Sequence, residues 1–234
     1  MGARPSWLRP KNWDEHVEHL EQMARSPGFL ALRDRILELA RLRAGDRLLD
    51  IGAGTGLLAL GAAARVERVF ALDVSPAMCG HLERKFSRLG VDNAEVVLKS
   101  ATALPLADGA VDVVVSNYCF HHLRDAEKAR ALAQIMRVLR PGGRLVFADV
   151  MFRISIVKRR DRAVIGLFLR RMIRHGPAGV LRLMRNATRL LAGRWEHPAS
   201  VEWWQSALLA AGFIEVEVQA LAHEGGIAVA RKPG

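Results

Sequence analysis

The sequence predicts an α/β protein, with a seven-stranded, mostly parallel sheet, helices on both faces and an antiparallel last strand. Short β-rich runs alternate with segments of helical length and pattern, which is typical of parallel strands joined by crossover helices. The last two runs are joined by a short connection that contains glycine, which indicates a hairpin. The predicted strands are residues 47–51, 68–73, 94–99, 111–117, 143–150, 213–221 and 225–232.

The chain of 234 residues is long enough to bury a sizeable core, and we expect a single domain with four parts. Residues 1–44 should form a cap of two helices, broken at residues 26–28, where Ser-Pro-Gly interrupts the helical pattern. Residues 45–150 should form the sheet core. Residues 151–197 indicate a basic helical lid, and residues 198–234 a closing helix and hairpin.

The composition excludes several classes of protein. Half of the residues are hydrophobic, yet no apolar run is long enough to span a bilayer. Residues 1–16 lack the apolar stretch of a secretory signal. Cys79 and Cys119 are too few for a disulfide framework and lack metal-ligand spacing. These features predict a cytoplasmic protein in a reducing compartment.

The net charge of +11 is concentrated in one segment. Residues 151–195 contain 12 basic residues and one acid, so they account for the whole imbalance. Amphipathic helices are predicted there at 163–175 and 179–191. Three interpretations stay open: a lid with solvated arginines, peripheral contact with an anionic membrane, and nucleic-acid binding, which the scarcity of aromatic residues disfavours.

Residues 48–56, LLDIGAGTG, form an apolar run that ends in an acid and leads into three glycines. Such a turn commonly holds a nucleotide, because glycine lets backbone N–H groups approach a ligand closely. A dinucleotide fingerprint would need glycine at the position of Leu57, and no Gly-Lys-Ser/Thr follows. The turn therefore disfavours NAD and FAD and excludes a P-loop.

Two carboxylates specify the ligand further. Asp50 lies at the end of the first predicted strand, where it can accept a hydrogen bond from a cationic amine and would repel a phosphate. Asp73 ends the second, where it can accept bonds from both hydroxyls of a ribose. The predicted ligand has a ribose and an amine but no phosphate.

With these motifs the sequence resembles the class I S-adenosylmethionine-dependent methyltransferases, over about residues 41–150 and the closing hairpin. LLDIGAGTG looks like the family's first motif, LDVSPAM like its second, ALPLADGAVDVVVSNYCFHHL like its fourth-strand motif, and IMRVLRPGGRLVFAD like the helix, turn and fifth strand of small-molecule members. The resemblance implies a Rossmann-like fold, S-adenosyl-L-methionine as cofactor and S-adenosyl-L-homocysteine as product. The most similar subfamilies methylate quinone precursors, phospholipid head groups and other small or lipid-like acceptors.

The resemblance also assigns the cofactor site. It implies that Asp50 orients the amino acid part of the cofactor, Asp73 the ribose, and that Met78 lies near the adenine. Ser100 stands where such proteins usually carry an acid, so Ser100 or the backbone at Ala101 would bond the adenine amine. The predicted cofactor-binding residues are Asp50, Gly52, Ala53, Gly54, Gly56, Asp73, Val74, Met78, Ser100, Ala101, Thr102, Ser116 and Asn117.

The candidate catalytic residues are Tyr118, His121 and His122, which follow the fourth strand at the edge where open α/β sheets bind ligands. Histidine can act as a general base because its pKa lies near neutrality, and His121 is preferred. The alternative is that these side chains only pack or lie in solvent. No metal is expected, because no His/Cys cluster has metal-ligand spacing and no acidic pair lies beside Asn117.

We therefore expect S-adenosylmethionine-dependent methyl transfer, by in-line displacement, to a small, apolar or lipid-like acceptor. The alternatives are an RNA methyltransferase that uses the basic segment and a non-catalytic adenosyl-binding protein. Carbon, nitrogen and oxygen all stay open as the accepting atom, and any oligomeric state is compatible with the sequence.

Overall fold

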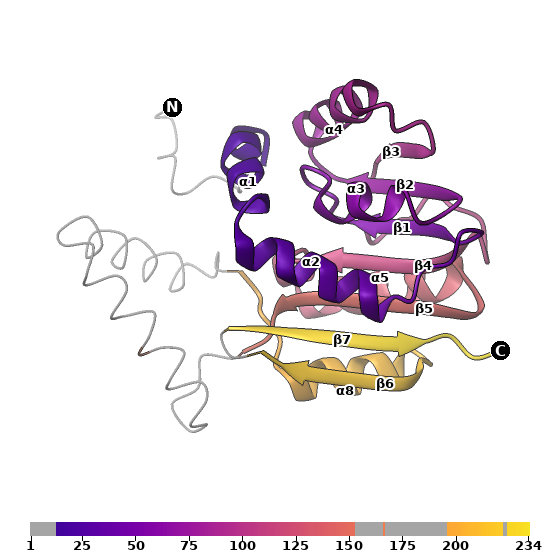
Figure 1. The fold of residues 1–234 in the computed structure, drawn as a ribbon. Helices are drawn as coiled ribbons and strands as arrows, with labels where there is room; N and C mark the ends of the chain where they lie inside the picture. The colour runs from indigo at the N-terminus through magenta and orange to yellow at the C-terminus, as the bar shows by residue number, and fades with distance from the viewer. Residues whose placement is uncertain (1–12, 153–165, 167–195, 222–223) are drawn as a thin grey trace, which may run out of the picture.

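The computed structural model describes residues 13–152, 166, 196–221 and 224–234, and it confirms the predicted sheet of seven strands (Figure 1). The strand order is β3-β2-β1-β4-β5-β7-β6. Strands β1 to β5 run parallel to one another, and β7 runs antiparallel to both β5 and β6. The strands are β1 (Arg47–Ile51), β2 (Arg68–Asp73), β3 (Ala94–Leu98), β4 (Val111–Asn117), β5 (Leu139–Val150), β6 (Ile214–Ala220) and β7 (Gly225–Arg231).

The central strands are apolar because helices cover both faces of the sheet. Leu48 and Val113 point into the layer that holds α2, α3 and α4. Their neighbours Leu49 and Val114 point into the opposite layer, which holds α5 and α8. This alternation follows the pleat of the strands. The helices are α2 (Pro27–Leu39), α3 (Leu57–Ala63), α4 (Pro76–Leu89), α5 (Asp125–Val138) and α8 (Val201–Ala210).

The strand order reverses between β1 and β4. The chain winds outward from β1 to β3 and then returns to place β4 on the other side of β1. At such a switch point, the carboxyl ends of the strands leave a crevice in which ligands bind. Ile51, Asp73 and Asn117 end β1, β2 and β4, so three of the predicted cofactor-binding segments meet at this edge.

The described part of the predicted cap consists of the 3-10 helix η2 (Trp13–His16), α1 (Val17–Ala24) and α2. Ser26 has an extended backbone, and Pro27 begins α2, where the missing N–H of proline removes no helical hydrogen bond. A break between the two helices is therefore confirmed, but it lies at residues 25 and 26, and Pro27 and Gly28 form the first turn of α2. Both η2 and α1 lie against α4. The predicted lid, 151–197, lies largely outside the described residues.

Strand β5 begins earlier than predicted. The sequence indicates a strand over 143–150 after a separate turn, whereas in the structure the strand begins at Leu139, which pairs with Val111. A register shift between Val111 and Val113 accommodates the extra residues, as in a β-bulge. Gly142 has a φ of 72° within this stretch, a conformation that glycine adopts readily.

The closing helix α8 packs on the sheet through Trp204, which is buried. Its ring lies 4.7 Å from that of Phe147 and 5.7 Å from that of Phe120, measured between centroids.

Every helix in the described part of the chain is too short or too polar to cross a membrane.

Candidate active site

The turn between β1 and α3 contains three left-handed glycines. Gly52, Gly54 and Gly56 have φ values of 71°, 53° and 87°, which residues with a side chain rarely adopt. A Cβ atom on Gly52 would lie 2.4 Å from Cys119 Sγ, so a side chain is excluded there. A Cβ atom on Gly54 would meet nothing closer than 3.9 Å, so this part of the turn is open to a ligand.

The glycine turn is tied to the neighbouring strand. The N–H groups of Gly52 and Ala53 both donate to Leu72 O in β2, at 2.8 and 2.9 Å. Lys85 in α4 also donates to Thr55 O at 2.9 Å. These bonds fix the backbone conformation of the turn, and none of them uses a side chain of the turn itself.

Asp50 lies beneath the turn and is 1% exposed. Its Oδ2 accepts a hydrogen bond from the Ala59 N–H at 3.0 Å, which ties β1 to α3. Burial raises the pKa of Asp50 to about 7, and the charge of Asp73 adds to this shift, although the bond from Ala59 opposes it. The predicted contact of Asp50 with the cofactor's amino group stays a prediction, and its observed partner is the start of a helix.

Asp73 lies at the carboxyl end of β2, as predicted. Its Oδ2 accepts from the Gly54 N–H and its Oδ1 from the Ser75 N–H, both at 2.9 Å. Burial raises the pKa of Asp73, while these backbone bonds lower it. An ionised carboxylate accepts about four hydrogen bonds, so both oxygens retain capacity for the hydroxyls of a ribose.

The residues predicted around the adenine differ in exposure. Val74 is 54% exposed, so it offers an apolar surface beside Asp73. Met78 is 1% exposed and its N–H donates to Ser75 Oγ, so little of its side chain is open to a ligand. Ala101 is buried, and its sequence neighbours Ser100 and Thr102 are joined by a hydrogen bond of 2.9 Å between Ser100 Oγ and Thr102 Oγ1. The adenine contacts of Met78, Ser100, Ala101 and Thr102 stay predictions.

Two polar residues end β4. Ser116 is fully buried and its Oγ donates to Ile51 O at 2.8 Å, which joins β4 to β1. The neighbouring Asn117 has a buried Oδ1 with no hydrogen-bond partner among the described residues. A buried acceptor without a donor is unfavourable by about 1–3 kcal/mol, so Asn117 Oδ1 marks a place where a ligand would supply the missing donor.

Tyr118 follows with a φ of 54°, an uncommon value for a residue with a side chain. Its N–H donates to Ala148 O at 2.8 Å, and its ring lies 5.6 Å from that of Phe29. Burial raises the pKa of the Tyr118 phenol to about 12, with further contributions from the charges of Glu224 and Asp149. At neutral pH this hydroxyl is therefore protonated and can donate a hydrogen bond.

His121 is held by a carboxylate that the sequence analysis did not single out. The ring atom Nδ1 of His121 lies 2.5 Å from Asp149 Oδ1, and the backbone N–H of His121 donates to Asp149 Oδ2 at 2.9 Å. Asp149 is completely buried near the carboxyl end of β5. The signal for it was available, because Asp149 follows the same rule as Asn117: a polar residue near the carboxyl end of a central strand.

His122 and Glu196 complete a polar cluster around His121. The rings of His121 and His122 lie 3.8 Å apart. Glu196 lies 3.8 Å from His121 Nε2 and 3.9 Å from His122 Nδ1. Sequence spacing gave no signal for this group, because Glu196 is distant along the chain. These three side chains have the chemistry and proximity of metal ligands, whereas the spacing of residues along the sequence predicts no metal.

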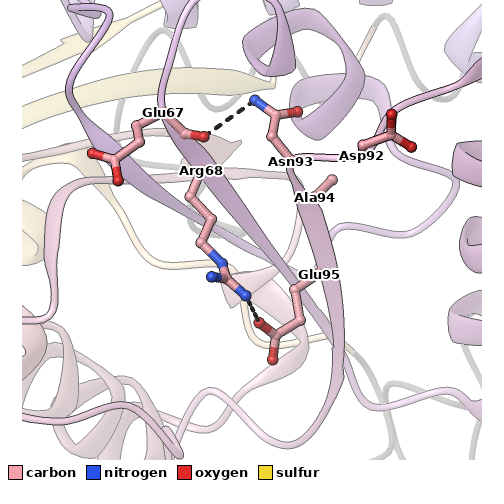
Figure 2. A pocket seen from close by; sticks show the side chains of 6 residues that line it. All are labelled: Glu67, Arg68, Asp92, Asn93, Ala94 and Glu95. Carbon is pink, nitrogen blue, oxygen red and sulfur yellow. Dashed lines mark hydrogen bonds and ion pairs between the residues drawn. The ribbon is translucent and has the colours of Figure 1, made fainter.

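A surface pocket lies at the amino-terminal ends of the strands, opposite the glycine turn (Figure 2). Within it, Arg68 pairs with Glu95 at 2.7 Å, and Asn93 Nδ2 donates to Glu67 O at 3.4 Å. Because these residues lie at the amino ends of β2 and β3, the pocket is separate from the site that Asp73 and Asn117 mark. Its lining residues are Glu67, Arg68, Asp92, Asn93, Ala94 and Glu95.

The fold and the site together define a class. A switch-point crevice, an open glycine turn and a carboxylate on the second strand are features of an α/β protein that binds a nucleoside. A sequence model described as a methyltransferase domain matches residues 48–143. An uncharacterised methyltransferase of Geobacillus sp. (strain WCH70) is 32% identical over 153 residues, which are 65% of this chain and 68% of that relative. The chain belongs to the class I S-adenosylmethionine-dependent methyltransferases.

Other relatives match over a smaller share of their length. An uncharacterised methyltransferase of Geobacillus kaustophilus is 34% identical over 143 residues, 61% of this chain and 64% of the relative, so the chain spans less than two thirds of that protein. The 27-O-demethylrifamycin SV methyltransferase of Amycolatopsis mediterranei is 36% identical over 142 residues, 59% of this chain and 49% of the relative. A solved S-adenosylmethionine-dependent methyltransferase from Aquifex aeolicus shares the fold, with a TM-score of 0.65 at 20% identity over 93% of this chain and 97% of that one.

The site fits the cofactor of this family. The open backbone at Gly54, the acceptor capacity of Asp73 and the unpartnered Asn117 Oδ1 match a ligand that brings hydroxyl and amine donors and no phosphate. S-adenosyl-L-methionine has these groups.

Proposed function

We propose that this chain transfers the methyl group of S-adenosyl-L-methionine to a hydroxyl oxygen of a small organic acceptor, with His121 as general base. One observation carries the proposal: His121 Nδ1 lies 2.5 Å from the buried carboxylate of Asp149, at the carboxyl edge where β4 and β5 end. A histidine held in this way is suited to accept a proton. A hydroxyl acceptor needs such a base, whereas an acceptor that is already ionised does not.

The geometry supports one direction of proton transfer. An ionised Asp149 only accepts hydrogen bonds, so His121 Nδ1 carries the proton in that pair and Nε2 carries the lone pair. Nε2 takes the hydroxyl proton of the acceptor as its oxygen forms the new bond to carbon. Asp149 stabilises the resulting imidazolium. The bound cofactor supplies an electrophilic methyl group, whose bond to sulfur breaks with the electron pair retained by the sulfur.

Aromatic side chains around the histidines support an apolar acceptor. The ring of Trp13 lies 4.5 Å from that of His122, and the ring of Tyr118 lies 6.2 Å from that of His121. Phe29 extends this surface from α2. Flat or lipid-like alcohols and phenols suit such walls, and the Tyr118 hydroxyl can donate to a second oxygen of the acceptor. A relative named for the 27-O position of rifamycin is consistent with an oxygen acceptor.

The first test identifies the acceptor and measures the role of His121. A cell extract incubated with the protein and deuteromethyl-labelled cofactor should yield a labelled methyl ether by mass spectrometry. His121→Ala and Asp149→Asn should then lower kcat for that acceptor by about 10²–10⁴-fold, while S-adenosyl-L-homocysteine binds as in the wild type. The matched control is His19→Ala, since His19 is an exposed histidine on α1.

The outcome separates base catalysis from structural damage. For a phenol acceptor, the deficit of His121→Ala should shrink as the pH approaches the pKa of the acceptor hydroxyl, because solvent then removes the proton. A variant that turns over at the wild-type rate would refute the general base. A wild-type protein that binds cofactor but labels nothing in a broad acceptor screen would support the non-catalytic adenosyl-binding alternative.

We also propose that the basic segment, residues 151–195, gives the cytoplasmic protein a peripheral contact with anionic lipid, close to a lipid-like acceptor. Its charge and its amphipathic sequence pattern support this proposal. Sedimentation should show binding to vesicles of phosphatidylglycerol and none to vesicles of phosphatidylcholine. Tight RNA binding that weakens steeply with salt would instead favour the RNA methyltransferase alternative.

A further inference from the structure

Three side chains beside the proposed base form a group with the chemistry of a metal site. His121 and His122 lie on the 3-10 helix η3 (Phe120–His122), and Glu196 approaches from a later part of the chain. One ligand atom from each lies within 4.8 Å of the others. Two imidazole nitrogens and one carboxylate are a ligand set that suits zinc and its transition-metal neighbours better than magnesium or calcium.

Glu196 is anchored at this place through the residue that follows it. The N–H of His197 donates to His121 O at 2.6 Å. The ammonium of Lys128, which is fully buried, donates to His197 O at 2.6 Å and to Leu123 O at 2.8 Å. These bonds connect the backbone of His197 to η3 and to α5. They hold the neighbouring Glu196 close to the two histidines.

Asp149 prepares His121 as a ligand. Because its carboxylate occupies Nδ1, the lone pair of His121 is on Nε2, the nitrogen that lies 3.8 Å from Glu196. A carboxylate behind a histidine is the usual arrangement at metal centres, where it orients the ring and raises the basicity of the ligand nitrogen. The side chains of His122 and Glu196 are 24% and 43% exposed, which gives an ion access from solvent.

The observed separations are larger than those of a bound state, and small side-chain movements would close the difference. Ligand atoms about 2.0–2.1 Å from a tetrahedral zinc lie about 3.3 Å apart. His121 Nε2 lies 3.8 Å from Glu196 Oε2, and His122 Nδ1 lies 3.9 Å from Glu196 Oε1, about half an ångström more than in such a site. One ligand atom of each residue lies within 4.8 Å of the others, so rotation of the half-exposed glutamate and a small shift of the His122 ring would bring the three atoms around one ion. Three protein ligands also leave a fourth position for water, as in open zinc sites.

We propose that His121 Nε2, His122 Nδ1 and the Glu196 carboxylate bind a divalent transition-metal ion, and that the bound ion blocks methyl transfer because it occupies the lone pair that takes the proton. The binding half stands on the cluster alone, whereas the inhibitory half rests on the proposed role of His121 as base.

Metal binding is tested with the metal alone, in the full chain freed of metal by a chelator. Titration with Co²⁺ should give one visible absorption band that saturates at one ion per chain, and Zn²⁺ should displace it. His122→Ala and Glu196→Gln should each weaken Co²⁺ binding at least about tenfold, as should Asp149→Asn. The control variant His19→Ala removes an exposed histidine far along the chain from the cluster and should bind as the wild type does.

Two results would overturn the binding half: no saturable Co²⁺ site in the wild type, or equal affinity in the wild type and in both ligand variants. Circular dichroism of each variant shows that a loss of binding does not come from unfolding. This titration uses neither cofactor nor acceptor, so its outcome is independent of the proposed methyl transfer.

Inhibition is tested with an acceptor that the wild type methylates. Zn²⁺ at ten times its dissociation constant should lower the rate about tenfold, EDTA should restore it, and binding of S-adenosyl-L-homocysteine should not change. A rate that stays constant or rises while Zn²⁺ is bound would overturn the inhibitory half. Absence of turnover without metal would count against the proposed function and leave the binding result standing.

Discussion

Asp73 joins cofactor recognition to the shape of the glycine turn, since each of its oxygens already accepts a backbone N–H. We predict that Asp73→Ala weakens S-adenosyl-L-homocysteine binding by about 10–100-fold, because hydrogen bonds to a charged group contribute about 1.5–3 kcal/mol. Isothermal titration calorimetry measures the change. Asp92→Ala, an exposed aspartate in the pocket of Figure 2, is the matched control and should bind normally. Unchanged affinity in Asp73→Ala would contradict the ribose contact.

Asp50 makes stability depend on pH. Burial raises its folded-state pKa to about 7 from the 3.8 of an unperturbed aspartate, so between these values the folded chain holds a proton that the unfolded chain has lost. Its stabilising contribution is complete below pH 3.8 and decreases as the pH rises toward 7. Relative to Asp50→Asn, the wild type should lose at most about 1.4 kcal/mol of unfolding free energy per pH unit across this window.

Urea unfolding of both proteins at several pH values between 4.5 and 7.5 measures this difference. The asparagine retains an oxygen that can accept from the Ala59 N–H, so the comparison isolates the titration from the helix contact. Parallel pH profiles for the two proteins would show that Asp50 is ionised throughout the range.

Among the elements, α1 is joined to α4 by a partly buried ion pair. Lys85 Nζ in α4 lies 2.7 Å from Glu21 Oε2, and the same ammonium bonds the glycine turn at Thr55 O. Burial alone would raise the pKa of Glu21, but hydrogen bonds from Lys85 and Arg25 outweigh it and lower that pKa to about 2. The Lys85 ammonium therefore connects the α1 helix to the glycine turn.

We predict a coupling free energy of about 0.5–3 kcal/mol between Glu21→Gln and Lys85→Met in a double-mutant cycle measured by urea unfolding. The exposed pair Arg68 and Glu95, with the same 2.7 Å separation, is the control and should couple by about 0.2–1 kcal/mol. Equal coupling in the two cycles would mean that burial of the Glu21 pair adds nothing.

The elements also show what local pattern can predict. Strands β1, β2 and β4 begin and end at the predicted residues, because their apolar runs are bounded by polar residues and turns. Strand β5 was predicted too short, since its first residues are held by a bulged pairing with Val111. A partner strand decides that pairing, so the sequence alone indicated a turn before residue 143 instead.

For the whole molecule, Lys128 connects parts of the chain that are distant in sequence. It is fully buried, and burial lowers its pKa although Asp125 opposes the shift. We predict that Lys128→Met lowers the free energy of unfolding by at least about 2 kcal/mol, because the carbonyls of Leu123 and His197 lose their donor.

Urea unfolding measures that loss, and Lys99→Met, which replaces an exposed lysine, should change stability by less than about 0.5 kcal/mol. Should Lys128→Met prove as stable as the wild type, solvent or another group must satisfy both carbonyls.

By itself, the sequence determined the sheet, the glycine turn and the carboxylate at its second strand, because strand periodicity, glycine conformation and strand ends are local properties of the chain. Only the tertiary structure decided that Asp50 supports a helix, that Asp149 holds His121, and that Glu196 joins the two histidines. Those contacts link residues from different elements, and their distances depend on strand order, on helix packing and on bonds such as those of Lys128. No spacing along the chain encodes them.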